Sequence, residues 1–229
     1  MANGGAVPRT QSAGPVATAL ARVDPTTRTV RARIRLPRAG GAATELTEDH
    51  VAVEADAVWA IAPNYAVVRI DPRANRIVAT IRGLQARAVA AGDAGVWVLG
   101  LDGTIARIDR ESNRIAARDR IRASSVASLA VGGGAAWVSA PGDGTVWRVQ
   151  PGPRLVMRTI DAGPGVGDLA FGAGSLWAVN PLRGTLVRID PAGDRPGQTV
   201  RLGGAPRAVA VGREGVWVAV AGDARRSWR

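Results

Sequence analysis

Apolar residues occur along this chain in short runs of five to seven positions, bounded by glycine, aspartate, proline or asparagine. The runs are rich in valine, isoleucine and alanine. Short β-branched runs between turn-forming residues are typical of β-strands. The pattern therefore predicts an all-β protein.

These runs form a repeat of about 40 residues. Five blocks resemble VAVGREGVWVAV and contain tryptophans spaced by 38, 40, 40 and 40 residues: Trp59, Trp97, Trp137, Trp177 and Trp217. The first four blocks are each followed by one like GTLVRIDP and one like NRIVATI. Each repeat thus predicts four strands, A (VAVG), B (VWVA), C (TLVRID) and D (NRIVATI). A four-stranded unit of this length, repeated without helices, is typical of a β-propeller blade.

The strand-B tryptophans are expected to pack between neighbouring blades. A single blade exposes two apolar faces, and radial stacking buries both of them. The alternative is an aromatic cage for a ligand, but five equivalent copies suit five equivalent interfaces better.

The chain divides into a propeller and two short ends. We expect residues 1–17 to be a linker or a truncated strand, 18–221 to form the propeller and 222–229 to be a tail. The predicted parts of the propeller are strands C and D at 18–36, full blades at 51–83, 88–121, 129–162 and 169–204, and strands A and B at 207–221.

The two incomplete units suggest how the ring closes. Pairing of 215–221 with 18–24 would form a fifth blade shared by both ends, and it would hide two sheet edges. The alternative is a fragment of a six- or seven-bladed propeller, since Ala2-Asn3-Gly4 resembles the end of a strand B.

Composition removes several function classes. The chain has no cysteine and one histidine, which excludes thiolate sites and argues against a multi-histidine metal centre. The net charge is +11 and all 30 basic residues are arginine. Many recur once per repeat, so they are spread around the molecule and nucleic acid is not the favoured partner. No apolar run is long enough for a membrane span, and no signal peptide is evident.

Candidate site residues lie in the predicted loops, where function concentrates. The long acidic connection at 37–50 is the most individual feature of the chain, and in propellers the D–A and B–C loops share one face. The candidates for ligand binding on this face are Glu48, Asp49, His50, Asn64, Arg87, Asp102, Asp143, Asp168, Asn180, Arg183 and Arg207.

The blocks at 209–220 (VAVGREGVWVAV), 184–191 (GTLVRIDP) and 75–81 (NRIVATI) resemble actinobacterial YVTN/NHL-like propellers, which include YncE-like proteins and the virginiamycin B lyase superfamily. The resemblance implies a six- or seven-bladed ring more often than five, and many relatives are secreted. Its lyase branch implies a magnesium-assisted elimination with a histidine base, for which this chain offers only His50. A full lyase site does not match residue by residue.

We therefore expect a non-catalytic binding propeller that presents one loop face to a protein, peptide or glycan, without a cofactor and as a monomer. A lyase-like enzyme, with Mg²⁺ and His50, is the second hypothesis. A sensor or scaffold segment of a larger protein is the third.

Overall fold

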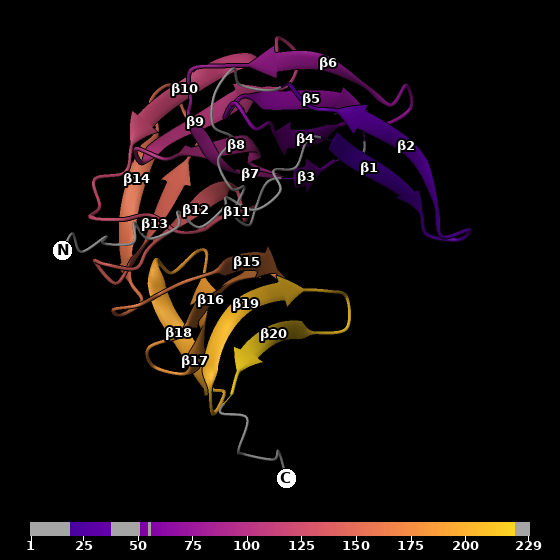
Figure 1. The fold of residues 1–229 in the computed structure, drawn as a ribbon. Coiled ribbons are helices and arrows are strands. Elements are labelled where there is room, and N and C mark those ends of the chain that lie inside the picture. Colours follow the sequence, from indigo (N-terminus) through magenta and orange to yellow (C-terminus); the bar gives the residue numbers. More distant parts are fainter. Residues whose placement is uncertain (1–18, 38–50, 55, 223–229) are drawn as a thin grey trace, which may run out of the picture.

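The computed structural model describes residues 19–37, 51–54 and 56–222. Within these ranges the regular secondary structure consists of β-strands, without helices. The strands form four four-stranded antiparallel sheets and two two-stranded sheets. Figure 1 shows the six sheets as consecutive blades of an arc. The predicted all-β propeller architecture is confirmed. No helix in the described ranges is long and apolar enough to cross a bilayer.

The four complete blades follow one another along the chain. They are β3 (Val51–Val53), β4 (Val58–Ile61), β5 (Val67–Asp71) and β6 (Arg76–Ile81); β7 (Ala86–Gly92), β8 (Gly95–Gly100), β9 (Thr104–Asp109) and β10 (Arg114–Arg120); β11 (Leu129–Gly132), β12 (Ala135–Ala140), β13 (Thr145–Gln150) and β14 (Val156–Asp161); and β15 (Leu169–Gly172), β16 (Ser175–Asn180), β17 (Thr185–Asp190) and β18 (Arg195–Arg201). They are flanked by the hairpins β1 (Ala19–Asp24) with β2 (Thr29–Arg35) and β19 (Ala205–Val211) with β20 (Val216–Ala221).

The recurring aspartate at the end of the third strand builds the turn to the fourth. Asp71 Oδ1 accepts hydrogen bonds from the backbone N–H groups of Arg73 (2.7 Å) and Ala74 (3.0 Å). The N–H of Ala74 and then that of Arg73 hold the pKa of the Asp71 carboxyl below its ordinary value, because both favour the charged form. Asn75 then takes a φ of 51°, in the left-handed region that asparagine tolerates better than most residues.

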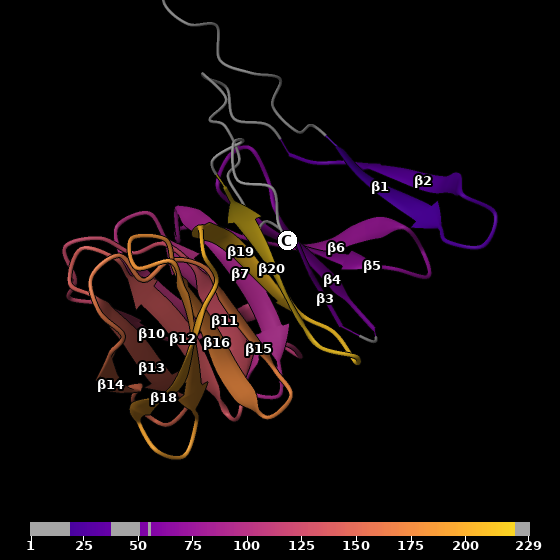
Figure 2. The same cartoon turned by 90° about the horizontal axis from the view of Figure 1, so that it is seen from below.

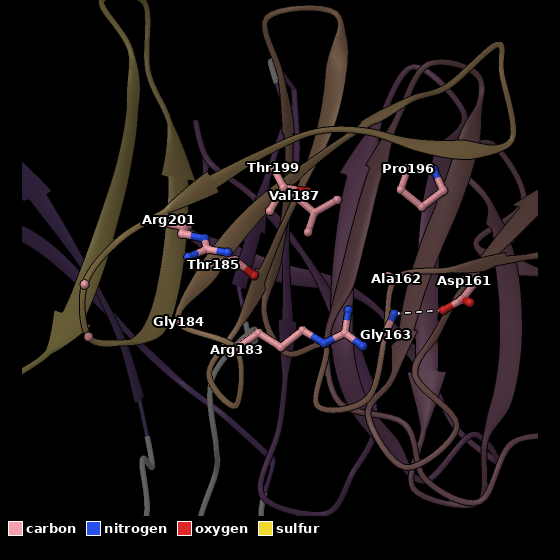
Figure 3. Close-up of a pocket in the computed structure, with 12 residues that line it drawn as sticks. Asp161, Ala162, Gly163, Arg183, Gly184, Thr185, Val187, Pro196, Thr199 and Arg201 are labelled. Atoms are coloured by element: carbon pink, nitrogen blue, oxygen red, sulfur yellow. Dashed lines mark hydrogen bonds between the residues drawn. The ribbon is translucent and has the colours of Figure 1, made fainter.

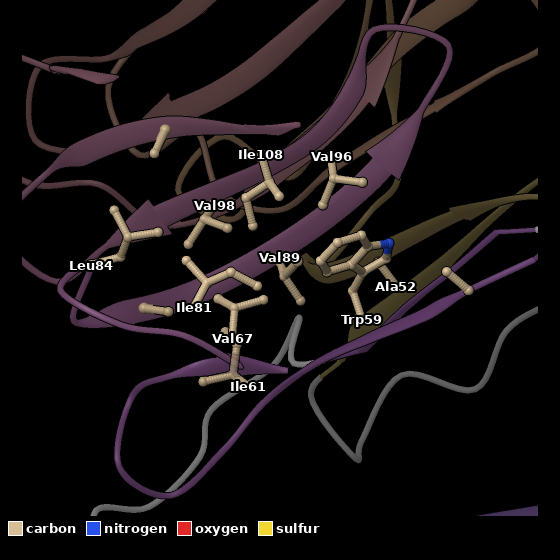
Figure 4. Close-up of a cluster of buried hydrophobic side chains, with 13 residues drawn as sticks. Ala52, Trp59, Ile61, Val67, Ile81, Leu84, Val89, Val96, Val98 and Ile108 are labelled. Carbon is tan, nitrogen blue, oxygen red and sulfur yellow. The ribbon is translucent and has the colours of Figure 1, made fainter. Parts of the chain in front are cut away.

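The strand-B tryptophans fill the spaces between blades. Trp59 of β4 is fully buried in one cluster with Val89 and Val96 of the following blade (Figure 4). Trp97 and Trp137 are also fully buried, each in a cluster that reaches into the next blade. These apolar interfaces hold the arc together, since large aromatic side chains contribute most to packing energy.

A recurring arginine on the third strand joins two of the tryptophans to the next blade. Arg69 lies opposite Trp59 in the β4–β5 register, with its Cζ 5.5 Å from the ring centroid. Its Nη1 donates to the carbonyl oxygen of Arg110 (2.6 Å) and to Asn113 Oδ1 (3.0 Å) of the next blade. Arg148 lies over Trp137 in the same way and donates to Asp194 Oδ1 at 2.7 Å.

The ends of the arc differ from the predicted closed ring. Within the described residues, β1 pairs only with β2 and β20 only with β19, so the predicted hydrogen bonds between 215–221 and 18–24 are not formed. The two hairpins lie at opposite ends of the arc in Figure 1. Trp217 of β20 is consequently 70% exposed, unlike its equivalents in the complete blades. The number of blades in a closed ring stays a prediction.

Candidate functional site

A cleft of about 720 Å³ opens on the loop face at the outer side of the β15–β18 blade. It is bounded by the end of β14 with the following loop, by the turn between β16 and β17, and by the loop after β18. Figure 3 shows its lining, whose members are Asp161, Ala162, Gly163, Arg183, Gly184, Thr185, Val187, Pro196, Thr199, Arg201, Gly203 and Gly204. The cleft is thus built from D–A and B–C loops, the segments that the sequence predicts to carry binding, together with residues of the strands β17 and β18.

Asn180 fixes the turn that carries Arg183. Its side chain is 1% exposed; Oδ1 accepts from the backbone N–H of Arg183 (3.1 Å), and Nδ2 donates to the carbonyl oxygen of Pro164 (3.0 Å). Gly184 completes the turn with a φ of 63°, a conformation that favours glycine. Because this amide joins the turn to the neighbouring loop, the backbone below Arg183 is held on both sides.

Two guanidinium groups enter the cleft from different elements. Arg183 extends from its turn toward Gly163 and Asp161, and Arg201 lies at the end of β18, opposite Thr185 in the register (Figure 3). No hydrogen bond or ion pair joins either guanidinium to another group in the part of the chain that the structure describes. The cleft therefore offers up to ten N–H donors that the fold itself does not use.

The one carboxylate of the cleft is partly engaged by its own loop. Asp161 Oδ1 accepts a hydrogen bond from the backbone N–H of Gly163 at 2.9 Å. The charges lining the cleft are thus two positive and one negative. The local field favours an anionic ligand, in the same direction as the net charge of +11.

Three other predicted residues hold loops in place: Asn64 and Asp102 within their own turns, and Asp143 between two loops. Asn64 Oδ1 accepts from the N–H of Ala66, and Asp102 accepts from the N–H and hydroxyl of Thr104. Asp143 accepts from the hydroxyl and N–H of Ser124, and these two bonds lower the pKa of its carboxyl below the ordinary value.

Asp168 belongs to a network that ties three blades together near the axis. Its Oδ1 accepts from the hydroxyl of Ser128 (2.8 Å), and its Oδ2 accepts from the backbone N–H of Val209 (2.8 Å). Ser128 Oγ in turn accepts from the N–H of Leu169 at 3.2 Å. These bonds link the innermost strands β11, β15 and β19.

The remaining predicted residues are not brought to the cleft. Arg87 and Arg207 occupy β-bulges at the start of β7 and β19. Glu48, Asp49 and His50 lie outside the described residues. Within the described residues, no group of three or more His, Asp or Glu side chains is placed to hold a metal ion.

Of the two arginines that line the cleft, Arg183 is among the candidates that the sequence offers, and Arg201 is not. The register shows why, because the last residue of the fourth strand faces a threonine in three successive blades: Thr104 with Arg120, Thr145 with Asp161 and Thr185 with Arg201. An arginine that recurs with the repeat looks structural in the sequence. The signal in the sequence that could have found the cleft is the aspartate at this position in the middle blade. Asp161 and Arg201 carry opposite charges at equivalent positions of two neighbouring blades.

The antiparallel four-stranded blades, their radial arrangement and the loop-face cleft define this protein as a β-propeller. No family model matches the sequence, and no curated protein sequence matches it.

Solved structures with the same fold are numerous. The β-propeller domain of Myceliophteria thermophila Cps50 (Swd1) aligns with a TM-score of 0.62 and 14% sequence identity, over 72% of this chain and 60% of that domain. A streptogramin B lyase aligns with a TM-score of 0.63 and 13% identity, over 75% of this chain and 61% of the lyase. Kuenenia stuttgartiensis hydrazine synthase aligns with a TM-score of 0.64 and 13% sequence identity, over 89% of this chain and 68% of the synthase chain.

These likenesses show the fold alone, because one propeller architecture serves many functions. The part of this chain that matches covers about 60% of the Swd1 domain and of the lyase.

Proposed function

We propose that this chain is a binding module, not an enzyme, and that its loop-face cleft takes a carboxylate-rich segment of a protein or peptide. The observation that carries the proposal is the pair of guanidinium groups, Arg183 and Arg201, that share one cleft and are left unpaired by the described chain. A guanidinium presents its donors in a planar fork that matches the two oxygens of a carboxylate.

The size of the cleft fits this purpose. A volume of about 720 Å³ lies within the range of roughly 300–1,000 Å³ that is usual for sites binding small ligands or short segments. Thr185 and Val187 of β17 lie on its rigid floor, and Thr199 on β18 adds a hydroxyl. Side chains that project from strands of a packed blade lose little freedom on binding, which favours affinity.

The proposal is tested with a fluorescent peptide of eight residues rich in glutamate and aspartate. Fluorescence anisotropy is measured for the wild type, for Arg183→Ala and for Arg201→Ala. Each substitution removes a charge-assisted contact of about 1.5–3 kcal/mol, so we expect each to weaken binding about 10- to 100-fold.

Arg195→Ala is the matched control. Arg195 lies on β18 like Arg201, is exposed and does not line the cleft. We expect it to change the dissociation constant less than twofold. Equal losses in all three variants would mean diffuse attraction to a basic surface and would contradict the proposal. Unchanged affinity in Arg183→Ala would do so directly.

Lyase-like elimination is the alternative, and the structural likeness to a streptogramin B lyase favours it at the level of fold. His50 would act as the base in a Mg²⁺-dependent reaction. Turnover of a streptogramin that requires Mg²⁺ and disappears in His50→Ala would establish the alternative, whereas turnover that persists in that variant would remove His50 from it.

The third hypothesis is that the chain is a sensor or scaffold segment of a larger protein. We propose, from the repeat blocks alone, a relation to YVTN/NHL-like and YncE-like propellers. If the chain is a sensor or scaffold segment of a larger propeller, the in-frame DNA upstream of Met1 should encode a further VWVA block. Sequencing of the locus tests this.

A further inference from the structure

One end of the arc carries an uncovered apolar face. β20 has the sequence VWVAVA, and Trp217 on it is 70% exposed, beside Ala219 and Ala221 on the same face of the strand. In the register, Trp217 lies opposite Ala210 of β19, which is also exposed. The outer edge of β20 has no strand paired to it within the described residues. A flat, uncharged strand with a free edge readily pairs with another strand.

The other end carries an apolar groove. A space of about 310 Å³ lies between the β1–β2 hairpin and the β3–β6 blade, and its walls are mostly apolar. They include Leu20 and Ile34 of the hairpin and Val51, Val53 and Val58 of the blade. Val53 is 70% exposed and Val51 is 46% exposed, so no element among the described residues covers these valines.

The two ends are complementary halves of one interface. In the complete blades a strand-B tryptophan lies beside the strand-C arginine of the same sheet, as Trp59 does with Arg69 and Trp177 with Arg188. At the groove, Arg22 already reaches forward to the carbonyl oxygen of Pro72 and to Asn75 Oδ1 (3.1 Å), but no strand that the structure describes places a tryptophan beside it.

At the opposite end the situation is reversed. Trp217 is present on β20, and no described strand supplies an arginine beside it. The pairing of strand B with strand C that the chain makes within each complete blade therefore lacks one half at each end, and each end holds the half that the other lacks.

We propose that the β19–β20 hairpin of one molecule docks into this groove of a second copy of the same chain, so that the molecules assemble head to tail. β20 pairs with β1 of the second copy and completes a four-stranded blade β19–β20–β1–β2. The register follows the complete blades, where Trp59 faces Arg69 and Trp177 faces Arg188. Trp217 therefore faces Arg22, and Val218 faces Ala21.

A second copy fits better than the hairpin of the same molecule. Closure within one chain would require the arc to tighten until its two ends meet (Figure 1). Three of the tryptophans between the blades, Trp59, Trp97 and Trp137, are fully buried, and close-packed interfaces resist a change of angle. A second copy docks without any change in these interfaces. Head-to-tail contacts of this kind extend into open chains of molecules, in contrast to the monomer that the sequence predicts.

The absence of cysteine allows a direct test by disulfide trapping. In the double variant Ala21→Cys/Val218→Cys, mild oxidation should give a ladder of covalent dimers and larger species on a non-reducing gel. Mixing the two single variants should give a covalent dimer that contains one of each. Leu101→Cys/Val218→Cys is the control for random collision, because Leu101 is 52% exposed and lies in the turn between β8 and β9, within the second complete blade.

Two outcomes would overturn the proposal. An internally bridged monomer without a ladder would show closure within one chain. Bridging no faster than in the Leu101 control would show that the two ends do not meet at all.

Light scattering over a range of concentrations supplies the second measurement. Trp217→Ala should weaken association about 30-fold, the effect typical of a tryptophan at the centre of an interface. Arg22→Ala should weaken it as well, whereas Leu101→Ala should leave it unchanged. A wild type that stays monomeric at all concentrations, or a Trp217→Ala variant that associates like the wild type, would contradict the assembly.

Discussion

Trp137 and Trp217 occupy the same repeat position, yet one is fully buried and the other is 70% exposed. Replacing each with alanine therefore measures what an inter-blade interface contributes. Trp137 packs between two blades, donates from Nε1 to the carbonyl oxygen of Gly132 (2.9 Å), and lies 5.5 Å from the Arg148 guanidinium carbon. We expect Trp137→Ala to be strongly destabilising.

The magnitude follows from the buried area. A buried tryptophan removes about 200 Å² from water, worth about 5 kcal/mol at 25 cal/mol per Å², and measured Trp→Ala costs are about 3–5 kcal/mol. We predict a loss of about 4 kcal/mol in the free energy of unfolding for Trp137→Ala. Trp217 buries about a third as much, so Trp217→Ala should cost about 1.5 kcal/mol.

Urea unfolding followed by far-UV circular dichroism, at protein concentrations low enough to keep the chain monomeric, gives both values from the transition midpoints. The two substitutions remove the same atoms, so any difference reports the environment. Equal losses, or a larger loss for Trp217→Ala, would refute the inference that the strand-B tryptophans hold neighbouring blades together.

Two further predictions concern the same interfaces. The hydrogen bond from Arg148 is the main reason that the pKa of Asp194 lies below 3.8, so its stabilisation is present above that value and is lost as the pH falls through the folded pKa. The wild type should therefore lose more stability than Asp194→Asn on acidification from about pH 5 to about pH 2, measured as urea midpoints; parallel losses would contradict this. A Cβ on Gly132 would lie 2.0 Å from the Phe171 ring, so Gly132→Ala should cost about 1–3 kcal/mol. Gly215→Ala, which points into open space, should be nearly neutral in the same measurement, and equal costs would refute the steric argument.

The blades were predictable because their determinants are local. Runs of β-branched residues give the strands, and an aspartate at the end of the third strand in three of the four complete blades gives the turn that Asp71 illustrates. The strands β7–β10, for example, form one such blade from Ala86 to Arg120. In a repeat protein the same features occur in every copy, so a single copy that departs from the pattern does not hide them.

The pairing of the two ends was not predictable in the same way. Whether β20 meets β1 depends on the angle at every blade interface, and that angle is set by how side chains such as Trp97 and Trp137 pack. Periodicity in the sequence carries no information about this angle. The place of Arg201 in the cleft was not predicted for a related reason, because a side chain that recurs with the repeat can line a cleft at one blade only.

Repeat position alone therefore does not separate structural from functional residues. A better criterion is whether the hydrogen-bond donors of a side chain are used within the fold. Arg69 and Arg148 are held between a tryptophan and the next blade, while Arg183 and Arg201 have donors that the described chain does not use. Because the cleft and the two ends of the arc lie on different residues, the two proposals separate experimentally. Arg183→Ala should weaken peptide binding without changing assembly, and Arg22→Ala should weaken assembly without changing peptide binding. Loss of both properties in either variant would mean that the cleft is completed only when molecules associate.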